Sequence, residues 1–361
     1  MVIPLLLHGQ HAEAPAYEPV GSWIVPWRFD SLEAEYLRLR TSCGLLDYST
    51  LSVIEVRGAD RAGYLQRMLT NDVLRLVAGR GSEGALLTPQ GRLVSGLIVL
   101  ADEDAHWLLA DTTRAPAVLA QLERAVFSED VRFANHERRW AALALQGPGA
   151  PAFAARLAPA AAALSSEGDH VRLTLEGMAA WVVRHALTDE AGLLCLVEPD
   201  EARALWDRLL RRREPDAPGL VGWGALNTAR IEAGIPWIDI DLDDQTLLAE
   251  AGLEARLSSD TKGCYVGQEI VARLKTYGST SRRLCGLLIE STDVPDAGSL
   301  LARGDEEVGR ITSACLSPAL ERPIALGWLK RGSYDPGTTV TVKSGAAPVP
   351  ASVVALPFLP P

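Results

Sequence analysis

The sequence predicts an α+β protein that ends in a small, separate β-barrel. Two observations predict the α+β part: strand-like apolar runs alternate with stretches of helical periodicity, and the same order of elements occurs twice. A third observation predicts the barrel. After residue 284 the helical periodicity disappears, and short strands follow one another between Gly, Pro, Ser and Asp turns.

The first round of elements follows the order strand, helix, two strands, helix. Its expected members are residues 53–56, 65–69, 93–100, 106–110 and 118–126. Residues 79–84 match a dinucleotide-binding glycine pattern, but they precede a strand instead of opening a helix, so we interpret them as a turn.

The second round repeats this order and leads into the barrel. Its strands are expected at residues 141–145, 171–175 and 179–185, with an Ala-rich helix after the first and another helix over 205–210. Two such rounds suggest paired split βαβ units. Four barrel strands are expected at 284–290, 308–312, 324–329 and 338–342, and the proline-rich end is expected to be irregular.

The composition is that of a globular chain longer than one hydrophobic core usually supports. Of 361 residues, 48% are hydrophobic and 22% are charged, and the formal net charge is −11. This charge disfavours nucleic acid and anionic membrane surfaces as partners. No apolar stretch reaches the ~18 residues of a membrane helix. We therefore expect a cytoplasmic protein that folds alone, as a monomer.

Cysteine and histidine spacing excludes two kinds of site. The five cysteines are odd in number, scattered and without a CxxC pair, which argues against a disulfide framework or a zinc site. The six histidines do not cluster at metal-ligand spacing. No bound metal is expected.

The octapeptide KGCYVGQE at residues 262–269 combines features that activate a thiol. Cys264 lies between two glycines, Lys262 is two residues before it, and a helix is expected just after it. A nearby cation and a helix N-terminus both lower a thiol pKa, so Cys264 is a candidate nucleophile, redox group or transient metal ligand. On composition alone, an inert buried cysteine is the more frequent alternative.

Two further polar positions are candidates for ligand contacts. Glu232 lies in the last turn of an expected helix, where a carboxylate is slightly unfavourable, and it could accept two donors from an aminopteridine ring. A surface Glu232 paired with Arg230 is at least as frequent. Asn71 and Asp72 follow a helix and are first interpreted as a turn, and second as the lining of a cleft.

The octapeptide also resembles the signature of the YgfZ group of folate-binding proteins. Other blocks are similar to the wider glycine-cleavage T-protein (GcvT, aminomethyltransferase) superfamily, so the resemblance covers nearly the whole chain. These blocks are CGLLDYS at 43–49, LQRMLTNDV at 65–73, GRLVSGLIV at 91–99, ALQGPGA at 144–150, RIEAGIPWIDIDL at 230–242 and GWLKRGSYDPGTTVTV at 327–342.

The resemblance implies an α+β fold with a three-domain T-protein-like ring around a folate cavity. Two ferredoxin-like or split βαβ units would form a folate-binding region over residues 1–283, interleaved and divided at roughly residue 140. An antiparallel β-barrel would form the C-terminal domain over residues 284–361.

The resemblance also assigns candidate roles to particular residues. Cys264 and Lys262 look like the residues on which activity in the YgfZ group depends, and Glu232 looks like the carboxylate that hydrogen-bonds the pterin ring. Leu108 and Ala110 fall on a strand that lines the pocket. The full expected folate-contact set is Glu232, Arg230, Asn71, Leu108, Ala110, Tyr265 and Gln268.

One departure from the T-protein pattern bears on activity. Aminomethyltransferases carry paired aspartates where this chain has Ser95 and Gly96, and neither residue can act as a carboxylate base, although Asp72 or Glu269 could substitute. We therefore expect a protein that binds tetrahydrofolate, or a one-carbon derivative, and supports iron–sulfur cluster assembly or repair in client proteins. The alternatives are a folate-dependent aminomethyltransferase and a scaffold with a vestigial folate site.

Overall fold

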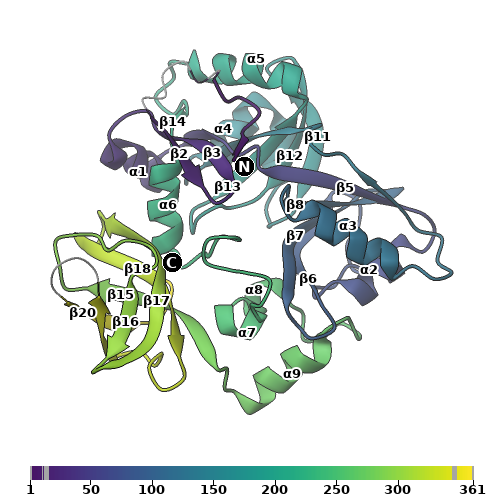
Figure 1. The fold of residues 1–361 in the computed structure, drawn as a ribbon. Helices are drawn as coiled ribbons and strands as arrows, with labels where there is room; N and C mark the ends of the chain where they lie inside the picture. Colours follow the sequence, from purple (N-terminus) through teal and green to yellow (C-terminus); the bar gives the residue numbers. More distant parts are fainter. Residues whose placement is uncertain (1, 10, 12–15, 344–347, 360–361) are drawn as a thin grey trace. The chain divides into compact units, whose positions relative to one another are not determined.

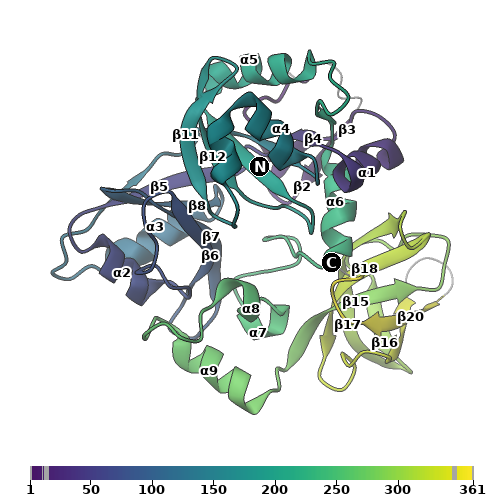
Figure 2. The same ribbon diagram turned by 180° about the vertical axis from the view of Figure 1, so that it is seen from behind.

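The computed structural model describes residues 2–9, 11, 16–343 and 348–359, which divide into two compact units (Figures 1 and 2). The first unit comprises Met1–Ala225 and Ala255–Gln268, and the second comprises Leu226–Glu254 and Glu269–Pro361. The chain therefore crosses between the units three times. The domain boundary expected at residue 283 stays a prediction.

The first unit contains a five-stranded antiparallel sheet in the strand order β6-β7-β8-β5-β9. Helices α2 and α3 cover one face, where Tyr64, Leu65 and Val118 are fully or almost fully buried against the strands. Its elements are β5 (Leu51–Arg57), α2 (Arg61–Met68), β6 (Arg80–Leu87), β7 (Leu93–Ala101), β8 (Ala105–Asp111), α3 (Ala115–Arg124) and β9 (Arg132–Asn135).

A six-stranded sheet in the same unit repeats this element order. Three strands lie between the helices of each round where the sequence analysis expected two, so the strands over 80–87 and 192–197 were not predicted. Its strand order is β11-β12-β13-β10-β4-β14, so β4 (Gly44–Asp47) is inserted where β5 and β9 are direct neighbours in the first sheet. The other elements are β10 (Ala141–Gln146), α4 (Ala150–Leu157), a 3₁₀ helix (Pro159–Ala163), β11 (His170–Leu175), β12 (Met178–Arg184), β13 (Gly192–Val197), α5 (Pro199–Leu210) and β14 (Gly219–Leu220).

The N-terminal segment adds a small three-stranded sheet to the first unit. Strand β1 (Ile3–Pro4) pairs with β3 (Trp23–Arg28), which pairs in turn with β2 (Ala16–Val20). Helix α1 (Leu32–Thr41) follows and is capped by Ser31, whose hydroxyl accepts a 3.2 Å hydrogen bond from the Ala34 amide.

The second unit is built around a closed six-stranded antiparallel barrel in the order β15-β18-β17-β16-β19-β20. The strands are β15 (Arg282–Ile289), β16 (Leu300–Arg303), β17 (Glu306–Ser317), β18 (Arg322–Lys330), β19 (Thr339–Lys343) and β20 (Val349–Val354). Closure leaves no exposed sheet edge. The predicted α+β fold with a C-terminal barrel is confirmed.

Four helices lie between the six-stranded sheet and the barrel in sequence. They are α6 (Trp223–Glu232), α7 (Leu248–Ala251), α8 (Glu254–Leu257) and α9 (Gln268–Tyr277). Helix α6 ends before Gly234, whose φ of +70° favours glycine. Within the described part of the chain, no helix combines the length and apolar character needed to cross a membrane.

Two local predictions are wrong. Residues 80–84 belong to strand β6 and not to a turn, and Gly81 is needed because a Cβ there would lie 2.6 Å from the Gly168 carbonyl oxygen. The proline-rich end contains strand β20. Pro350 is accommodated because it lies where the ladder to β15 ends: it pairs with Thr341 of β19, and towards β15 its carbonyl oxygen accepts the Glu290 amide at 2.9 Å.

Candidate functional site

Residues 255–268, which we call the return segment, bring the octapeptide back to the first unit. The Lys262 ammonium donates hydrogen bonds to the carbonyl oxygens of Gln66 (2.6 Å), Leu69 and Asn71 (3.0 Å). Helix α2 ends at Met68, so the Gln66 and Leu69 carbonyls lie where a helix C-terminus leaves carbonyls unpaired, and the Asn71 carbonyl follows just beyond the helix. A cation stabilises this end of the helix dipole. Lys262 therefore fastens the return segment to the end of α2.

Lys262 is buried, with 7% of its surface exposed. Burial lowers the pKa of Lys262 to about 8, and nearby Asp72 opposes that shift, so the ammonium still predominates at neutral pH. The Nζ atom also lies 5.0 Å from the centre of the Tyr265 ring. These contacts give Lys262 a positioning role. Its predicted part in catalysis stays a prediction.

Backbone hydrogen bonds reinforce this attachment. The Ser259 amide donates to the Thr70 carbonyl oxygen at 3.0 Å, and the Val266 amide donates to that of Arg67 at 3.0 Å. The Thr70 hydroxyl donates to the Leu257 carbonyl oxygen at 2.5 Å. The return segment is thus held at both ends and in the middle.

Cys264 is exposed on this fixed segment, whereas the chain's four other cysteines are buried. Burial raises the pKa of each of those four thiols to about 12, which leaves them protonated at neutral pH. The inert buried alternative for Cys264 is therefore wrong. A thiol reagent in solution has one accessible cysteine to modify.

Asn71, Tyr265 and Gln268 lie near Lys262 in the first unit, but their described contacts are local. Asn71 donates to the Glu83 carbonyl oxygen at 2.7 Å and accepts from the Asp72 amide at 2.9 Å, which is the contact of a turn residue. Tyr265 is 8% exposed, and its carbonyl accepts the Gln268 amide at 3.2 Å, where α9 begins. The structure brings these residues together. Their folate contacts stay a prediction.

Arg230 and Glu232 lie in the second unit. Arg230 is 1% exposed, and its guanidinium bonds Asp241, the Asn227 side chain and the Ser313 hydroxyl. It also stacks on Trp237 at 4.4 Å. All three nitrogens of the guanidinium are engaged within the unit. The expected folate contact of Arg230 stays a prediction.

Glu232 is fully buried and connects α6 to the barrel. Its carboxylate accepts a 2.5 Å hydrogen bond from the hydroxyl of Ser317, and its carbonyl oxygen accepts one of 2.8 Å from the Phe358 amide. The alternative of a surface Glu232 is wrong, because the residue is buried, and Arg230 forms its ion pair with Asp241.

Leu108 and Ala110 point into the helix-covered core of the five-stranded sheet. They are 0% and 1% exposed and pack with Leu65 and Val118 of the helices. The intervening Leu109 points to the opposite face, because side chains alternate along a strand. A ligand on that opposite face would meet the backbone of Leu108 and Ala110 and not their side chains.

Ser95 and Gly96 lie on β7, opposite Leu86 and Ala85 of β6. Ser95 is fully buried, and its hydroxyl donates to the Gly96 carbonyl oxygen at 2.7 Å. A Cβ added to Gly96 would meet no atom within 4 Å. The position therefore has room for a side chain but carries no acid.

A cluster that the sequence analysis missed lies near this position. It joins Glu83 of β6, Glu167, His185 and Arg256, residues far apart in the chain. Arg256 of α8 donates from Nε and Nη2 to the two oxygens of Glu83, each at 2.6 Å. No motif spacing signals this cluster. A strand, two loops and helix α8 each contribute a member, so tertiary packing brings them together.

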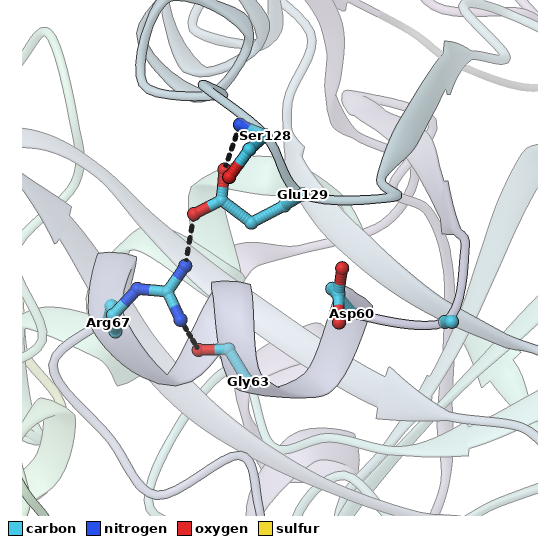
Figure 3. Close-up of a pocket in the computed structure, with 6 residues that line it drawn as sticks. Asp60, Gly63, Arg67, Ser128 and Glu129 are labelled. Carbon is cyan, nitrogen blue, oxygen red and sulfur yellow. Dashed lines mark hydrogen bonds and ion pairs between the residues drawn. The ribbon is translucent and has the colours of Figure 1, made fainter.

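An open pocket of about 530 Å³ lies elsewhere in the first unit (Figure 3). It is lined by Ala59, Asp60, Gly63, Arg67, Ser128 and Glu129. Glu129 accepts the Ser128 amide and pairs with Arg67, as Figure 3 shows. Hydrogen bonds from the Phe127 and Ser128 amides lower the Glu129 pKa to about 2. None of the predicted site residues lines this pocket.

Family models match almost the whole chain. The GCVT N-terminal domain matches residues 7–261, and the glycine cleavage T-protein C-terminal barrel domain matches residues 282–359. The chain belongs to the glycine cleavage T-protein family.

Relatives and a solved structure agree with this membership. The T-protein-family chain is 32% identical to an aminomethyltransferase of Rubrobacter xylanophilus over 94% of its own length and 89% of the relative's, and 30% identical to that of Bacillus subtilis over 94% and 93%. It resembles the crystal structure of glycine cleavage system aminomethyltransferase T from Bartonella henselae, with a TM-score of 0.86, 25% identity, and coverage of 99% and 98%. These findings support the broad family. The narrower YgfZ resemblance stays a proposal.

Proposed function

We propose that this T-protein-family chain binds tetrahydrofolate, or a one-carbon derivative, and transfers a one-carbon unit between it and an aminomethyl donor. One observation carries the proposal: relatives named aminomethyltransferase match over 94% of the chain, and the aminomethyltransferase structure superposes over 99% of it. Two matching domains, and not one shared motif, support the same activity. We also propose a cytoplasmic monomer, as expected above.

Glu232 is the proposed anchor for the pterin ring. It is fully buried in the second unit, where water competes little with a ligand. An aminopteridine presents adjacent N–H donors that match a carboxylate. A buried, oriented carboxylate supports recognition of this ring.

A second candidate function has its own observations. Cys264 is exposed on a segment fixed by Lys262, and Ser95 and Gly96 replace the paired acids of the T-protein pattern. Both features favour a YgfZ-type function, in which the chain binds folate and supports the assembly or repair of iron–sulfur clusters in client proteins. Under this hypothesis Cys264 is the reactive group, and aminomethyl transfer does not occur.

The experiment that tests these functions is calorimetric titration of tetrahydrofolate with a parallel aminomethyl-transfer assay. We would compare the wild type with Glu232→Gln and Cys264→Ser, and use the exposed Glu290→Gln as the matched control. Glu232→Gln should weaken folate binding at least tenfold, which corresponds to about 1.4 kcal/mol. Cys264→Ser and Glu290→Gln should bind normally.

The outcomes separate the candidates. Transfer by the wild type and by Cys264→Ser supports the transferase. Folate binding without any transfer overturns the transferase and favours the accessory function. The absence of folate binding overturns both and leaves a scaffold with a vestigial site.

A further inference from the structure

An imidazole in the first unit is held between two carboxylates. His185 Nδ1 lies 3.2 Å from Glu167 Oε2 and 3.9 Å from Glu83 Oε1. The side chains of His185 and Glu83 are 12% and 14% exposed, whereas that of Glu167 is 40% exposed. The cluster is therefore largely shielded and meets solvent mainly at Glu167.

The backbone fixes the position of His185. Its amide donates to the Gly192 carbonyl oxygen at 3.0 Å, and its own carbonyl oxygen accepts from Gln146 Nε2 at 3.1 Å. Within the described part of the chain, no side chain or carbonyl is recorded as a hydrogen-bond partner of His185 Nε2. An imidazole with one nitrogen on a carboxylate and the other unengaged has the geometry of a general base.

Glu167 remains a carboxylate beside this ring. Burial opposes its ionisation, but the hydrogen bond and charge of His185, the Ala186 amide and nearby Arg256 together lower the pKa of Glu167. A carboxylate on Nδ1 selects the tautomer whose Nε2 can accept a proton.

Glu83 sets the location of the cluster on the sheet. Glu83 lies two residues before Ala85, and Ala85 pairs with Gly96 of β7, so Glu83 and Gly96 share a sheet face. Diagonal neighbours across strands are about 7–8 Å apart. Because a Cβ on Gly96 would meet no atom within 4 Å, the cluster lies beside open space.

A metal site is the weaker interpretation of these residues. Arg256 already occupies both oxygens of Glu83 at 2.6 Å each, so a cation would have to displace a bidentate ion pair.

Asp72 and Glu269, the two carboxylates that the sequence offers as replacement proton acceptors, fit that role less well than His185. The Asp72 carboxylate is bonded by Gln66 and Arg75, and Glu269 lies exposed at the start of α9.

We propose that His185, oriented by Glu167, is the proton acceptor of the one-carbon transfer. This inference rests on the proposed function. The folate amine nitrogen attacks the methylene carbon of the aminomethyl donor, and the N–C bond forms as the bond from that carbon to its leaving atom breaks. The leaving atom takes the electron pair. The amine proton passes to His185 Nε2, which then returns it to the leaving group.

The test compares two variants with a matched control in the intact chain. His185→Gln and His185→Ala should lower kcat for transfer by about 10²–10⁴-fold with little change in tetrahydrofolate affinity. Added imidazole should restore part of the activity of His185→Ala, a rescue that a structural role would not give. The control His136→Gln removes another imidazole that lies 3.2 Å from a carboxylate, Glu55, and should leave transfer unchanged.

A second readout does not depend on turnover. Diethyl pyrocarbonate should modify His185 at the unengaged Nε2, and tetrahydrofolate should protect it, as measured by peptide mass spectrometry. His136 should be modified equally with and without folate.

Each outcome decides between the interpretations. Wild-type transfer that is unchanged in His185→Gln overturns the role of His185 and leaves the proposed function intact. Failure of the wild type to transfer overturns the proposed function. In that case, protection of His185 from diethyl pyrocarbonate by tetrahydrofolate would still support a location of His185 at the folate site. Equal modification with and without tetrahydrofolate would overturn that location too.

Discussion

Arg230 and Asp241 form an ion pair in which neither side chain is more than 1% exposed. Asp241 also accepts hydrogen bonds from Thr312, Ser313 and the Trp237 amide. The pair therefore joins the end of α6, the loop after it and strand β17 within the second unit.

We expect Arg230→Met to destabilise the second unit by about 3–5 kcal/mol, because it leaves the Asp241 carboxylate buried without its cation. Urea unfolding followed by tryptophan fluorescence would measure the change. The control Arg203→Met removes a surface pair with Asp207 and should change stability by less than about 0.5 kcal/mol. Equal effects of the two variants would contradict a central role for the Arg230 pair.

We expect Lys262→Met to loosen the return segment. Loss of the ammonium leaves the carbonyls of Gln66, Leu69 and Asn71 without their donor, at a cost of about 1–3 kcal/mol. The amides of Ser259 and Val266 should then exchange hydrogen faster, as measured by mass spectrometry. Lys343→Met, at an exposed barrel position, is the control. Unchanged exchange in Lys262→Met would show that backbone contacts alone hold the segment.

Gly96→Asp should fold normally and restore part of the aminomethyl transfer that His185→Gln loses. The added side chain points into open space, and it supplies an acid that the T-protein pattern carries at this position. In the His185→Gln background we expect kcat to rise by at least about tenfold, and Gly96→Asn, of the same shape but without charge, should give no rise. An unchanged kcat in the Gly96→Asp, His185→Gln double variant would mean that an acid at position 96 cannot replace His185.

Stability should fall in acid because of His106. This residue is 4% exposed, and neither ring nitrogen has a hydrogen-bond partner in the described part of the chain. Burial, with a smaller contribution from Arg61 that outweighs Asp102, lowers the pKa of His106 from 6.5 to about 4. Between pH 4 and 6.5 the unfolded chain binds more protons at His106 than the folded chain does. The contribution of His106 to the free energy of unfolding is therefore fully present above about pH 6.5 and is lost as the pH falls toward 4.

His106→Leu tests this directly. The difference in unfolding free energy between wild type and variant should vary with pH between 4 and 6.5 and become constant above that range. Parallel curves across the whole range would rule out His106 as the titrating group.

The fold was predictable because it depends on local periodicity. Apolar spacing and turn residues indicated both rounds and the barrel, and the last turn of α6 was expected at Glu232, where the helix ends. The errors came from tertiary contacts. Gly81 occupies a strand because another backbone approaches it, and Pro350 fits a strand because its missing N–H is not needed there.

The site was predictable only in part. Exposure of Cys264 fits its Gly-rich setting, but the partners of Lys262 are carbonyls about 190 residues earlier in the chain. The direction of the Leu108 and Ala110 side chains could be predicted only by knowing which face of the sheet the helices cover. The cluster of Glu83 and His185 joins a strand of one sheet to the loop that follows β12 of the other, a tertiary contact that no spacing along the sequence encodes.

Assembly of the six-stranded sheet depends on strand β4, which lies far from its partner strands in the sequence. It comes from residues 44–47, before the first round begins, yet it lies between β10 and β14. During synthesis the five-stranded sheet can close from contiguous sequence, whereas the six-stranded sheet must recruit a strand made about 100 residues earlier. Such distant pairings slow folding. A chain that starts after Asp47 would therefore retain the first sheet's strands but lose the parallel partner of β14.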